Sequence, residues 1–261
     1  NEIIEYAVQF AQMGVIVHVN IDLLDHLGAG YQREVTQIGN HYALSVAPRF
    51  FDFNKLVMKR IIDIVGAIVG LMITAVVMLF IAPAVKLESP GPLIFKQKRV
   101  GKNGRYFYIY KFRSMYIDAE ERKKELMAQN EMNGLMFKMK DDPRITKVGK
   151  FIRKTSIDEL PQLINIIVGD MAIVGPRPPL TYHPWPVEQY TEEQFHMFDV
   201  RPGITGWAQV HGRKGVEWHE RIKMNVWYTQ HVSLALDIRI LFMTVFKVLR
   251  NEDNVNTGAT V

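Results

Sequence analysis

The chain has 261 residues, with 32 Lys and Arg against 27 Asp and Glu, a formal net charge of +5 and no cysteine. The absence of cysteine excludes disulfide frameworks, thiolate nucleophiles, cysteine-ligated zinc and iron–sulfur clusters. With 48% hydrophobic and 23% charged residues, the composition also excludes a disordered tail, and the length suffices for one large domain or two small ones.

Residues 1–50 are interpreted as the C-terminal part of an α/β domain. Residues 3–13 have helical apolar spacing, residues 15–19 are a β-branched run, and residues 41–46 are a second strand-like stretch. Three scattered histidines lack the spacing of metal ligands, namely His18, His26 and His41. Because the sequence begins at Asn1 without an initiator Met, we expect a processed or truncated chain, or only a part of a longer one.

Residues 64–85 are an apolar run of membrane length. These 22 residues carry no charged side chain. A helix of that length measures about 33 Å, which suffices for a hydrocarbon core of about 30 Å. Buried helices of soluble proteins have shorter apolar runs, so the sequence predicts insertion into a bilayer.

Both flanks of this run are basic. Lys55, Lys59 and Arg60 precede it, and Lys86 follows it at the start of a second basic stretch. Basic flanks stay on the cytoplasmic side of a membrane. We therefore expect both ends of the helix on that side, with the helix entering the bilayer and returning; a true crossing is the alternative.

A basic and aromatic segment follows, with seven Lys and Arg and no acid between residues 89 and 117. Alternating residues on both sides of 101–104 predict a β-hairpin with a Gly-Lys-Asn-Gly turn. Residues 118–130 predict a solvated helix of mixed charge, and residues 138–154 form a second basic cluster. Both basic clusters could simply bind anionic lipid headgroups.

Asp158 and Glu159 are adjacent acids at a predicted helix start. The apolar stripe of residues 160–168 predicts a helix, and Pro161 is tolerated in its first turn if the helix begins at Asp158. The alternative is a structural capping box, in which Ser156 is the N-cap and Glu159 its partner. The residues alone leave catalysis and capping open.

The surroundings of this pair suit phosphoryl transfer. Arg153 and Lys154 are expected to keep Asp158 ionised and nucleophilic. Arg177 and Arg201 each lie in a turn made rigid by proline, which suits bidentate binding of phosphate. One carboxylate could attack phosphorus while Mg²⁺ and the guanidinium groups neutralise the charge.

Six ordered motifs resemble the bacterial sugar transferase family, the monotopic polyprenyl-phosphate sugar-1-phosphate transferases that initiate capsule, exopolysaccharide and O-antigen synthesis. The motifs are K-R-I-I-D at 59–63, F-K-Q-K-R-V-G at 95–101, Y-K-F-R-S-M at 110–115, S-I-D-E-L-P-Q-L at 156–163, V-G-P-R-P at 174–178 and R-P-G-I-T-G-W-A-Q-V at 201–210. The resemblance covers about residues 55–250. Residues 1–50 resemble the end of the nucleotide-binding-like domain of larger members.

The resemblance implies a two-step transfer. Asp158 would attack the β-phosphate of a UDP-sugar, release UMP and carry the sugar phosphate until undecaprenyl phosphate takes it up. Glu159 would bind Mg²⁺ together with Asp158, or handle the proton of the acceptor. The residues expected to bind phosphate or nucleotide are Arg153, Arg177, Lys111, Arg113, Arg201, Gln97 and Arg99.

The resemblance also bears on the membrane helix. Lys59, Arg60 and Asp63 match the base of the family's re-entrant helix. Small members break that helix at a Ser-Pro pair, whereas this chain has Ala75 and Val76 there. The bend is therefore expected to differ from theirs.

The C-terminal part is typical of an enzyme at a membrane surface. Residues 234–249 predict a helix that lies in the interface or packs on the domain, because three charges interrupt its apolar character. His211 and Arg213 are further candidates for contact with nucleotide or sugar.

The predicted architecture is α+β, with the α/β remnant at 1–50, the membrane helix at 51–88 and a mostly helical sugar-phosphate transferase domain with a small β-hairpin at 89–261. The expected partners are a UDP-sugar, undecaprenyl phosphate and the lipid bilayer, at the cytoplasmic face of the bacterial inner membrane. A homodimer is a further hypothesis, and no nucleic acid is expected. The rival hypothesis is a non-catalytic, membrane-anchored scaffold that binds anionic lipid.

Overall fold

The computed structural model describes residues 31–39, 41–48, 53–126, 142–212 and 216–250. The chain divides into two compact units between Asp52 and Phe53. The helix predicted at 3–13 and the strand predicted at 15–19 lie outside the described residues.

The described part of the first unit is an antiparallel hairpin. β1 (Tyr31–Ile38) pairs with β2 (His41–Pro48), with Ile38 opposite His41. β2 confirms the strand predicted at 41–46. β1 has no counterpart among the predicted strands, because charged and amide side chains dominate its sequence. The assignment of residues 1–50 to an α/β domain stays a prediction.

The second unit contains the predicted hairpin. β3 (Ile94–Val100) and β4 (Tyr106–Phe112) pair antiparallel, with Val100 opposite Tyr106. The turn holds a short 3₁₀ segment, η2 (Lys102–Gly104), in which Asn103 and Gly104 have φ of 55° and 74°. Asn and Gly adopt left-handed conformations more readily than other residues, which explains the turn.

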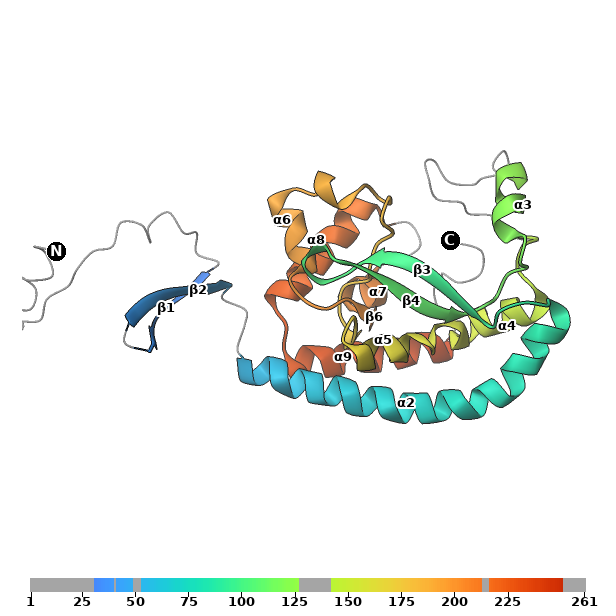
Figure 1. Cartoon of the computed structure of the whole chain (residues 1–261), viewed down its shortest axis with the longest axis horizontal. Coiled ribbons are helices and arrows are strands. Elements are labelled where there is room, and N and C mark those ends of the chain that lie inside the picture. The colour runs from blue at the N-terminus through green and yellow to red at the C-terminus, as the bar shows by residue number, and fades with distance from the viewer. Residues whose placement is uncertain (1–30, 40, 49–52, 127–141, 213–215, 251–261) are drawn as a thin grey trace, which may run out of the picture. The chain divides into compact units, whose positions relative to one another are not determined.

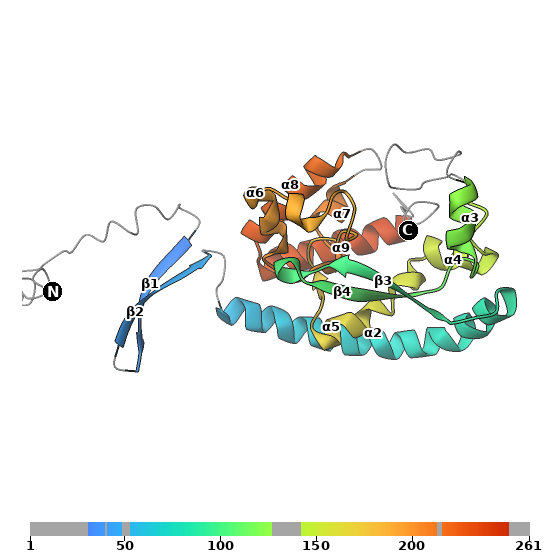
Figure 2. The same ribbon diagram turned by 45° about the horizontal axis from the view of Figure 1, so that its top comes forward.

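Helices surround this hairpin. They are α3 (Ala119–Leu126), α4 (Lys147–Lys154), α5 (Gln162–Val168), α6 (Glu192–Phe195), α7 (Trp207–His211), α8 (Trp218–Gln230) and α9 (Leu234–Arg250), with short 3₁₀ segments η4 (Ile157–Glu159), η5 (Val187–Gln189) and η6 (His196–Phe198). Figures 1 and 2 show α6 and α8 at one end of the hairpin and α3 and α4 at the other. The unit is therefore mostly helical, as predicted.

The two acids do not begin an α-helix. They lie in η4, and α5 begins only at Gln162, so the helix start predicted at Asp158 is wrong. Pro161 occupies the N-cap position of α5 instead of its first turn. The alternative of a capping box is also contradicted, because Ser156 has a left-handed φ of 57° and its side chain caps nothing.

Two glycine-containing turns meet in a second small sheet. β5 (Ala172–Val174) pairs in parallel with β6 (Gly203–Thr205). The backbone of Gly203 approaches Gly175 so closely that a Cβ at Gly203 would lie 2.0 Å from the Gly175 nitrogen. This approach brings the V-G-P-R-P and R-P-G-I-T segments side by side, although 28 residues separate the end of β5 from the start of β6.

The apolar run lies in α2 (Phe53–Glu88), a single helix of 36 residues. Figure 1 shows it curving along one side of the unit. Among the described residues it is the one helix long and apolar enough to cross a membrane; its most apolar window has a mean hydropathy of 2.8, and 17% of that window is buried. A core helix of a soluble protein is mostly buried, so this exposure favours a lipid environment.

Both ends of α2 are bonded to the same unit. Near its start, Lys59 Nζ donates to the Val174 carbonyl at 2.9 Å. At its end, Glu88 accepts from the backbone nitrogens of Lys147 and Val148 at 2.6 and 2.8 Å, and so binds the first turn of α4. The middle of α2 packs on α5, where a Cβ at Gly70 would lie 2.7 Å from a methyl group of Leu163.

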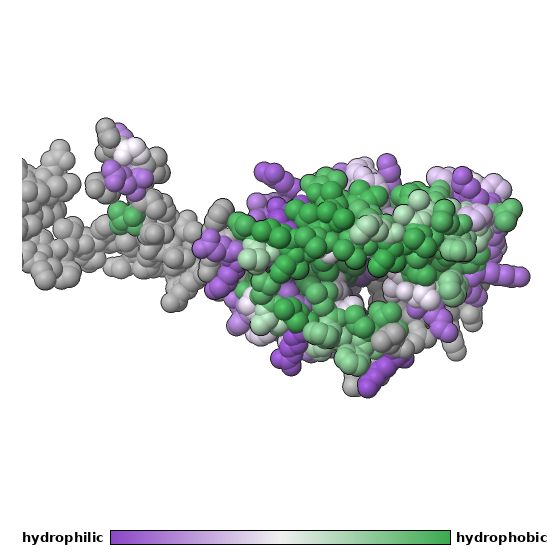
Figure 3. Space-filling view, turned by 90° about the horizontal axis from the view of Figure 1, so that it is seen from below, coloured by the Kyte–Doolittle hydropathy of each residue, from purple (hydrophilic) through white to green (hydrophobic). Residues whose placement is uncertain are grey.

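Apolar side chains of α2, α5 and α9 share one face of the unit. Figure 3 shows this face as a broad hydrophobic area with hydrophilic residues at its edges. α9 confirms the helix predicted at 234–249 and has two sides: Ile240 is fully buried, whereas Phe242 is 64% exposed. On α5, Val168 is 70% exposed. The exposed apolar area thus extends beyond the membrane helix itself.

Candidate active site

The acid pair lies in a chain reversal between α4 and α5. The Oγ1 atom of Thr146 caps α4 by accepting from the Gly149 nitrogen at 2.8 Å. The left-handed Ser156 then redirects the chain into η4, which packs against β4. In this way the reversal holds Asp158 and Glu159 beside the basic hairpin.

Glu159 is bound by two cations from distant parts of the sequence. Lys111 Nζ, on β4, donates to Glu159 Oε1 at 2.9 Å. Arg177 Nη2, in the turn after β5, lies 3.5 Å from the same oxygen. Glu159 is therefore an ionised anchor that orients both cations.

Asp158 is equally enclosed but lacks such a partner. Its side chain is 4% exposed, and its Oδ1 atom is buried without a hydrogen-bond partner in the described part of the chain. It lines a cavity of about 190 Å³ together with Arg153, Lys111, Gln97 and Ser114. The Asp158 side chain thus borders a space that the cations Lys111 and Arg153 also line.

The two carboxyl groups titrate in opposite directions. Burial raises the pKa of Asp158 to about 6, with Lys111 acting against it. Although burial acts in the same sense on Glu159, Lys111 and Arg177 outweigh it and lower the pKa of Glu159 to about 2. For Asp158, the effect of burial on the pKa is larger than that of the nearby cations Lys111 and Arg153. At neutral pH Asp158 is still roughly 90% ionised.

Gln97 and Arg99 form a unit on β3. Arg99 donates through Nε and Nη2 to Gln97 Oε1 at 3.1 and 2.5 Å, and through Nη1 to the Pro178 carbonyl at 3.1 Å. Burial, followed by the charge of Arg177, lowers the pKa of Arg99 to about 9, so it stays protonated at neutral pH. Two neighbouring guanidinium groups favour an anion between or beside them.

Arg153 is held at the cavity by a polar network. Its Nε donates to Ser114 Oγ at 2.7 Å. Behind it, Asp142 and Arg144 form a fully buried ion pair, with Arg144 Nη2 2.7 Å from Asp142 Oδ2. Lys154, the other cation predicted beside Asp158, is exposed on the surface of α4.

Two of the predicted phosphate ligands are engaged elsewhere. Arg113 donates from its guanidinium to the carbonyls of Ser89 and Pro90, and so fixes the chain just after α2 while its side chain lines the cavity. Arg201 donates from Nε to the Gly169 carbonyl at 2.8 Å, beyond the end of α5. Arg201 is not brought to the acid pair.

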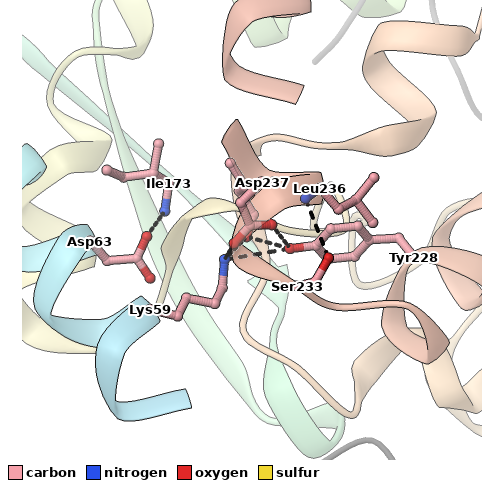
Figure 4. Close-up of polar contacts among 8 residues, drawn as sticks. Lys59, Asp63, Ile173, Tyr228, Ser233, Leu236 and Asp237 are labelled. Atoms are coloured by element: carbon pink, nitrogen blue, oxygen red, sulfur yellow. Dashed lines mark hydrogen bonds and ion pairs between the residues drawn. The ribbon is translucent and has the colours of Figure 1, made fainter. Parts of the chain in front are cut away.

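A polar cluster at the base of α2 joins the membrane helix to the turn of Arg177 (Figure 4). Lys59 Nζ lies 2.5 Å from Asp237 Oδ2 of α9 and donates to the Val174 carbonyl, which also accepts from the Tyr228 hydroxyl at 3.2 Å. Asp63 accepts from the Ile173 nitrogen at 2.9 Å. These bonds fix β5, and β5 leads directly into the turn that carries Arg177.

Arg60 binds the other side of the same helix base. Its Nη2 donates to the Ile167 carbonyl at 3.2 Å, near the C-terminal end of α5. A cation at this end of a helix is favoured by the exposed carbonyl groups. Lys59, Arg60 and Asp63 are thus all bonded within the second unit.

The carboxylates fit a magnesium ion that takes several of its ligands from the substrate. Mg²⁺ binds through one or two carboxylates and substrate phosphates. The partnerless Oδ1 of Asp158 meets this need, whereas Oε1 of Glu159 is already bound by Lys111. Among the described residues there is no cluster of three or more His, Asp or Glu that could hold a metal alone.

Several residues of the site are not found by sequence patterns. Ser114 and Asp142 act through tertiary contacts that no local motif announces. Asn165 is fully buried and bonds β4 at the Tyr108 carbonyl and the Tyr110 nitrogen, at 2.7 and 3.2 Å. The sequence does offer one indication of its role, because Asn165 is a polar residue within the apolar stripe of α5.

The remaining candidates lie to one side. His211 stacks on Trp207, with ring centroids 3.7 Å apart, and its Nδ1 lies 3.0 Å from the Trp207 carbonyl. Arg213 lies outside the described residues.

Comparison with known proteins gives a consistent assignment. The family model for bacterial sugar transferases matches residues 54–251. A galactosyl transferase CpsE from Streptococcus agalactiae is 46% identical over 248 residues, which are 95% of this chain and 53% of that protein.

Two other relatives have printed names that state a reaction. The UDP-glucose:undecaprenyl-phosphate glucose-1-phosphate transferase of Escherichia coli is 42% identical over 76% of this chain and 41% of its own length. The UDP-N-acetylgalactosamine-undecaprenyl-phosphate N-acetylgalactosaminephosphotransferase of Aeromonas hydrophila is 43% identical over 74% of this chain and 44% of its own length. The chain thus spans about half the length of these curated relatives.

Proposed function

Because the chain belongs to the bacterial sugar transferase family, we propose that it transfers sugar-1-phosphate from a UDP-sugar to undecaprenyl phosphate, and so initiates the assembly of a bacterial polysaccharide. The names of the relatives support this reaction class, and they differ in the sugar they state. The proposal therefore concerns the UDP-sugar as a class.

One observation carries the proposal at the residue level. Asp158 is ionised at neutral pH, buried, and supplied with an oxygen that has no hydrogen-bond partner within the described structure. Such a carboxylate is poorly solvated, which makes it a better nucleophile than an exposed one. Lys111 and Arg153 line the same cavity and supply positive charge for phosphate oxygens.

In the first step, an oxygen of Asp158 attacks the β-phosphorus of the UDP-sugar. A new carboxyl oxygen to phosphorus bond forms, and the bond from that phosphorus to the bridging oxygen breaks. UMP leaves with the bridging oxygen, and the sugar phosphate stays on the aspartate. Lys111, Arg153 and Arg177 stabilise the charge that develops on the phosphate oxygens.

In the second step, a phosphate oxygen of undecaprenyl phosphate attacks the same phosphorus. The bond to Asp158 breaks, and the carboxylate is restored. The product is a polyprenyl diphosphate that carries the sugar. Glu159 keeps Lys111 and Arg177 oriented through both steps and undergoes no change of its own charge, because its pKa of about 2 is far below neutral pH.

Magnesium is part of the proposal. Asp158, with Glu159 beside it, would hold the ion together with substrate phosphates, and the ion would neutralise phosphate charge and favour the departure of UMP. Lys111 and Arg177 are the protein's own cations that would neutralise phosphate charge beside the ion.

The bonds at both ends of α2 support a re-entrant membrane arrangement. Lys59 near its start and Glu88 at its end are bonded to the same unit, which supports a helix that enters and leaves one leaflet. A crossing would carry the two ends to opposite sides of a core of about 30 Å. We place the catalytic unit at the cytoplasmic face, where the UDP-sugar is available.

The test is UMP release by the purified protein from a panel of UDP-sugars, with and without undecaprenyl phosphate. We expect release with at least one donor, and a loss of at least about 1,000-fold in Asp158→Asn. Asp170→Asn is the matched control, because Asp170 lies beyond the C-terminal end of α5. Unchanged release by Asp158→Asn would refute the nucleophile, and no release from any donor would refute the reaction.

A further inference from the structure

A groove with a different lining from the cavity of Asp158 reaches the other residue of the acid pair. It encloses about 370 Å³ and is lined by Glu159 but not by Asp158. The two neighbouring carboxylates thus border two different spaces. In the second step of the proposed reaction the acceptor must reach the phosphorus that Asp158 carries, and this groove ends at the adjacent residue, Glu159.

The lining of the groove is mostly apolar. Its walls come from η4, α5, α7 and α9, and the apolar residues are Leu160, Leu163, Ile173, Ile204, Ala208, Val210, Leu241 and Val248. Val248 lines the groove and is also 45% exposed on α9. The groove is therefore continuous with the hydrophobic face that α2, α5 and α9 share (Figure 3).

The polar residues of the groove carry an excess of positive charge. Arg177, Arg221 and Lys247 line it, against the single acid Glu159. Arg221 donates from Nε to the Val216 carbonyl at 3.1 Å, and its guanidinium group lies over the Trp218 ring, 5.5 Å from the ring centroid. Burial and the neighbouring charge of Arg177 lower the pKa of Arg221. An anion bound between the two guanidinium groups would relieve this repulsion.

We propose that this groove binds the polyprenyl phosphate acceptor, with its phosphate at Arg177 and Arg221 and its first isoprene units along α9 and α5. This assignment rests on the proposed function and specifies where its second substrate lies. A long apolar chain with one anionic end matches an apolar groove that opens on the membrane face and ends at two arginines.

A labelling experiment tests this placement without relying on turnover. The chain contains no cysteine, so Val248→Cys gives a single thiol in the groove and Val245→Cys gives a matched thiol on the same helix, where Val245 is 56% exposed. Each variant is treated with a maleimide in detergent micelles containing polyprenyl phosphate, polyprenol, phosphatidylglycerol or UMP. We expect polyprenyl phosphate to slow labelling of Val248→Cys several-fold and to leave Val245→Cys unchanged.

The other probes separate the alternatives. Equal protection by phosphatidylglycerol would mean that the groove takes any anionic lipid, and protection by UMP would assign it to the donor. Absence of protection by polyprenyl phosphate would also overturn the proposal. Polyprenol should protect more weakly, because it lacks the group that the arginines bind.

A second pair of variants tests the phosphate end. Arg221→Gln, in the Val248→Cys background, should raise the polyprenyl phosphate concentration for half protection about tenfold, as expected for one lost charge-assisted hydrogen bond. Arg239→Gln, an exposed arginine of α9 that is not part of the groove, is the control. Equal effects of the two substitutions would contradict a specific phosphate site.

The outcomes remain distinct from those of the proposed function. UMP release from a UDP-sugar without protection at Val248→Cys would keep the reaction and remove this acceptor site. Protection without release of UMP from any donor would keep a polyprenyl phosphate site and remove the reaction.

Discussion

Adjacent carboxylates in one short 3₁₀ turn acquire different properties because their neighbours differ. Glu159 has Lys111 at 2.9 Å, whereas Oδ1 of Asp158 is buried without a partner among the described side chains. The contact with Lys111 stabilises the Glu159 carboxylate, whereas the poorly solvated Asp158 carboxylate stays reactive. The sequence predicts the pair and its basic surroundings, but Lys111 comes from a strand 48 residues away, so the contrast in pKa follows only from the tertiary structure.

The contrast predicts opposite effects of two isosteric substitutions on stability. Asp158→Asn removes a buried charge that folding disfavours, and should raise the free energy of unfolding at pH 7 by roughly 1–3 kcal/mol. Glu159→Gln leaves Lys111 without its anion and should lower it by about 2–4 kcal/mol. Thermal unfolding of the two variants in the same detergent measures both. A decrease for Asp158→Asn would contradict the assignment of its raised pKa.

The pKa of Asp158 also predicts a pH dependence. Only the ionised carboxylate attacks phosphorus, so the rate of the first step should fall as pH drops below about 6. Glu159, with a pKa of about 2, should not titrate in this range. The measurement is the rate of UMP release in a single turnover without acceptor, because the acceptor phosphate itself titrates near pH 6. A rate independent of pH between 5 and 7 would contradict the prediction.

At the scale of elements, the site depends on how short segments meet. The hairpin, the long apolar helix and the helix near 234–249 are predicted correctly, because alternation, length and apolar spacing are local signals. The start of α5 is mispredicted, because the left-handed turn at Ser156 is fixed by packing and not by its own sequence. The two arginine turns look alike in sequence, and their flanking strands pair through backbone hydrogen bonds. Their side chains nevertheless have different partners, because Arg177 contacts Glu159 whereas Arg201 donates to the Gly169 carbonyl.

The close approach of β5 and β6 predicts that Gly203 does not tolerate a side chain. A Cβ at Gly203 would meet the Gly175 backbone nitrogen at 2.0 Å, and backbone cannot move aside as a side chain can. Gly203→Ala should therefore destabilise the protein by roughly 3 kcal/mol and displace Arg177, with a loss of UMP release.

The matched control is Gly70→Ala in α2. Its Cβ would meet a methyl group of Leu163 at 2.7 Å, and a flexible side chain can rotate away. The free energy of unfolding should change by less than about 1 kcal/mol. Similar destabilisation by both substitutions would show that the meeting of the two turns is not special.

At the scale of the whole second unit, one apolar face and one catalytic layer belong to the same body. α2, α5 and α9 supply the face (Figure 3), while the acids lie in η4, which packs against α4 and β4. The polar cluster of Lys59, Asp237 and Val174 links the two layers through β5 (Figure 4). This arrangement would let a reaction between a water-soluble donor and a lipid acceptor occur at the membrane surface.

The bonds at both ends of α2 predict same-side topology. Single cysteines at Asn54 and Lys86, both exposed, should react with an impermeant maleimide from the same side of sealed vesicles. Lys150→Cys, exposed on α4, marks the side of the catalytic unit. Labelling of the two ends from opposite sides would establish a crossing.

The covalent step is the central claim, and intact-mass analysis of the purified chain after incubation with its UDP-sugar, in the absence of acceptor, tests it most directly. We expect a mass increase equal to one sugar phosphate, which persists in Asp170→Asn, is absent from Asp158→Asn and disappears when polyprenyl phosphate is added. Release of UMP that requires the acceptor and leaves no adduct on the chain, or an adduct that survives Asp158→Asn, would contradict it.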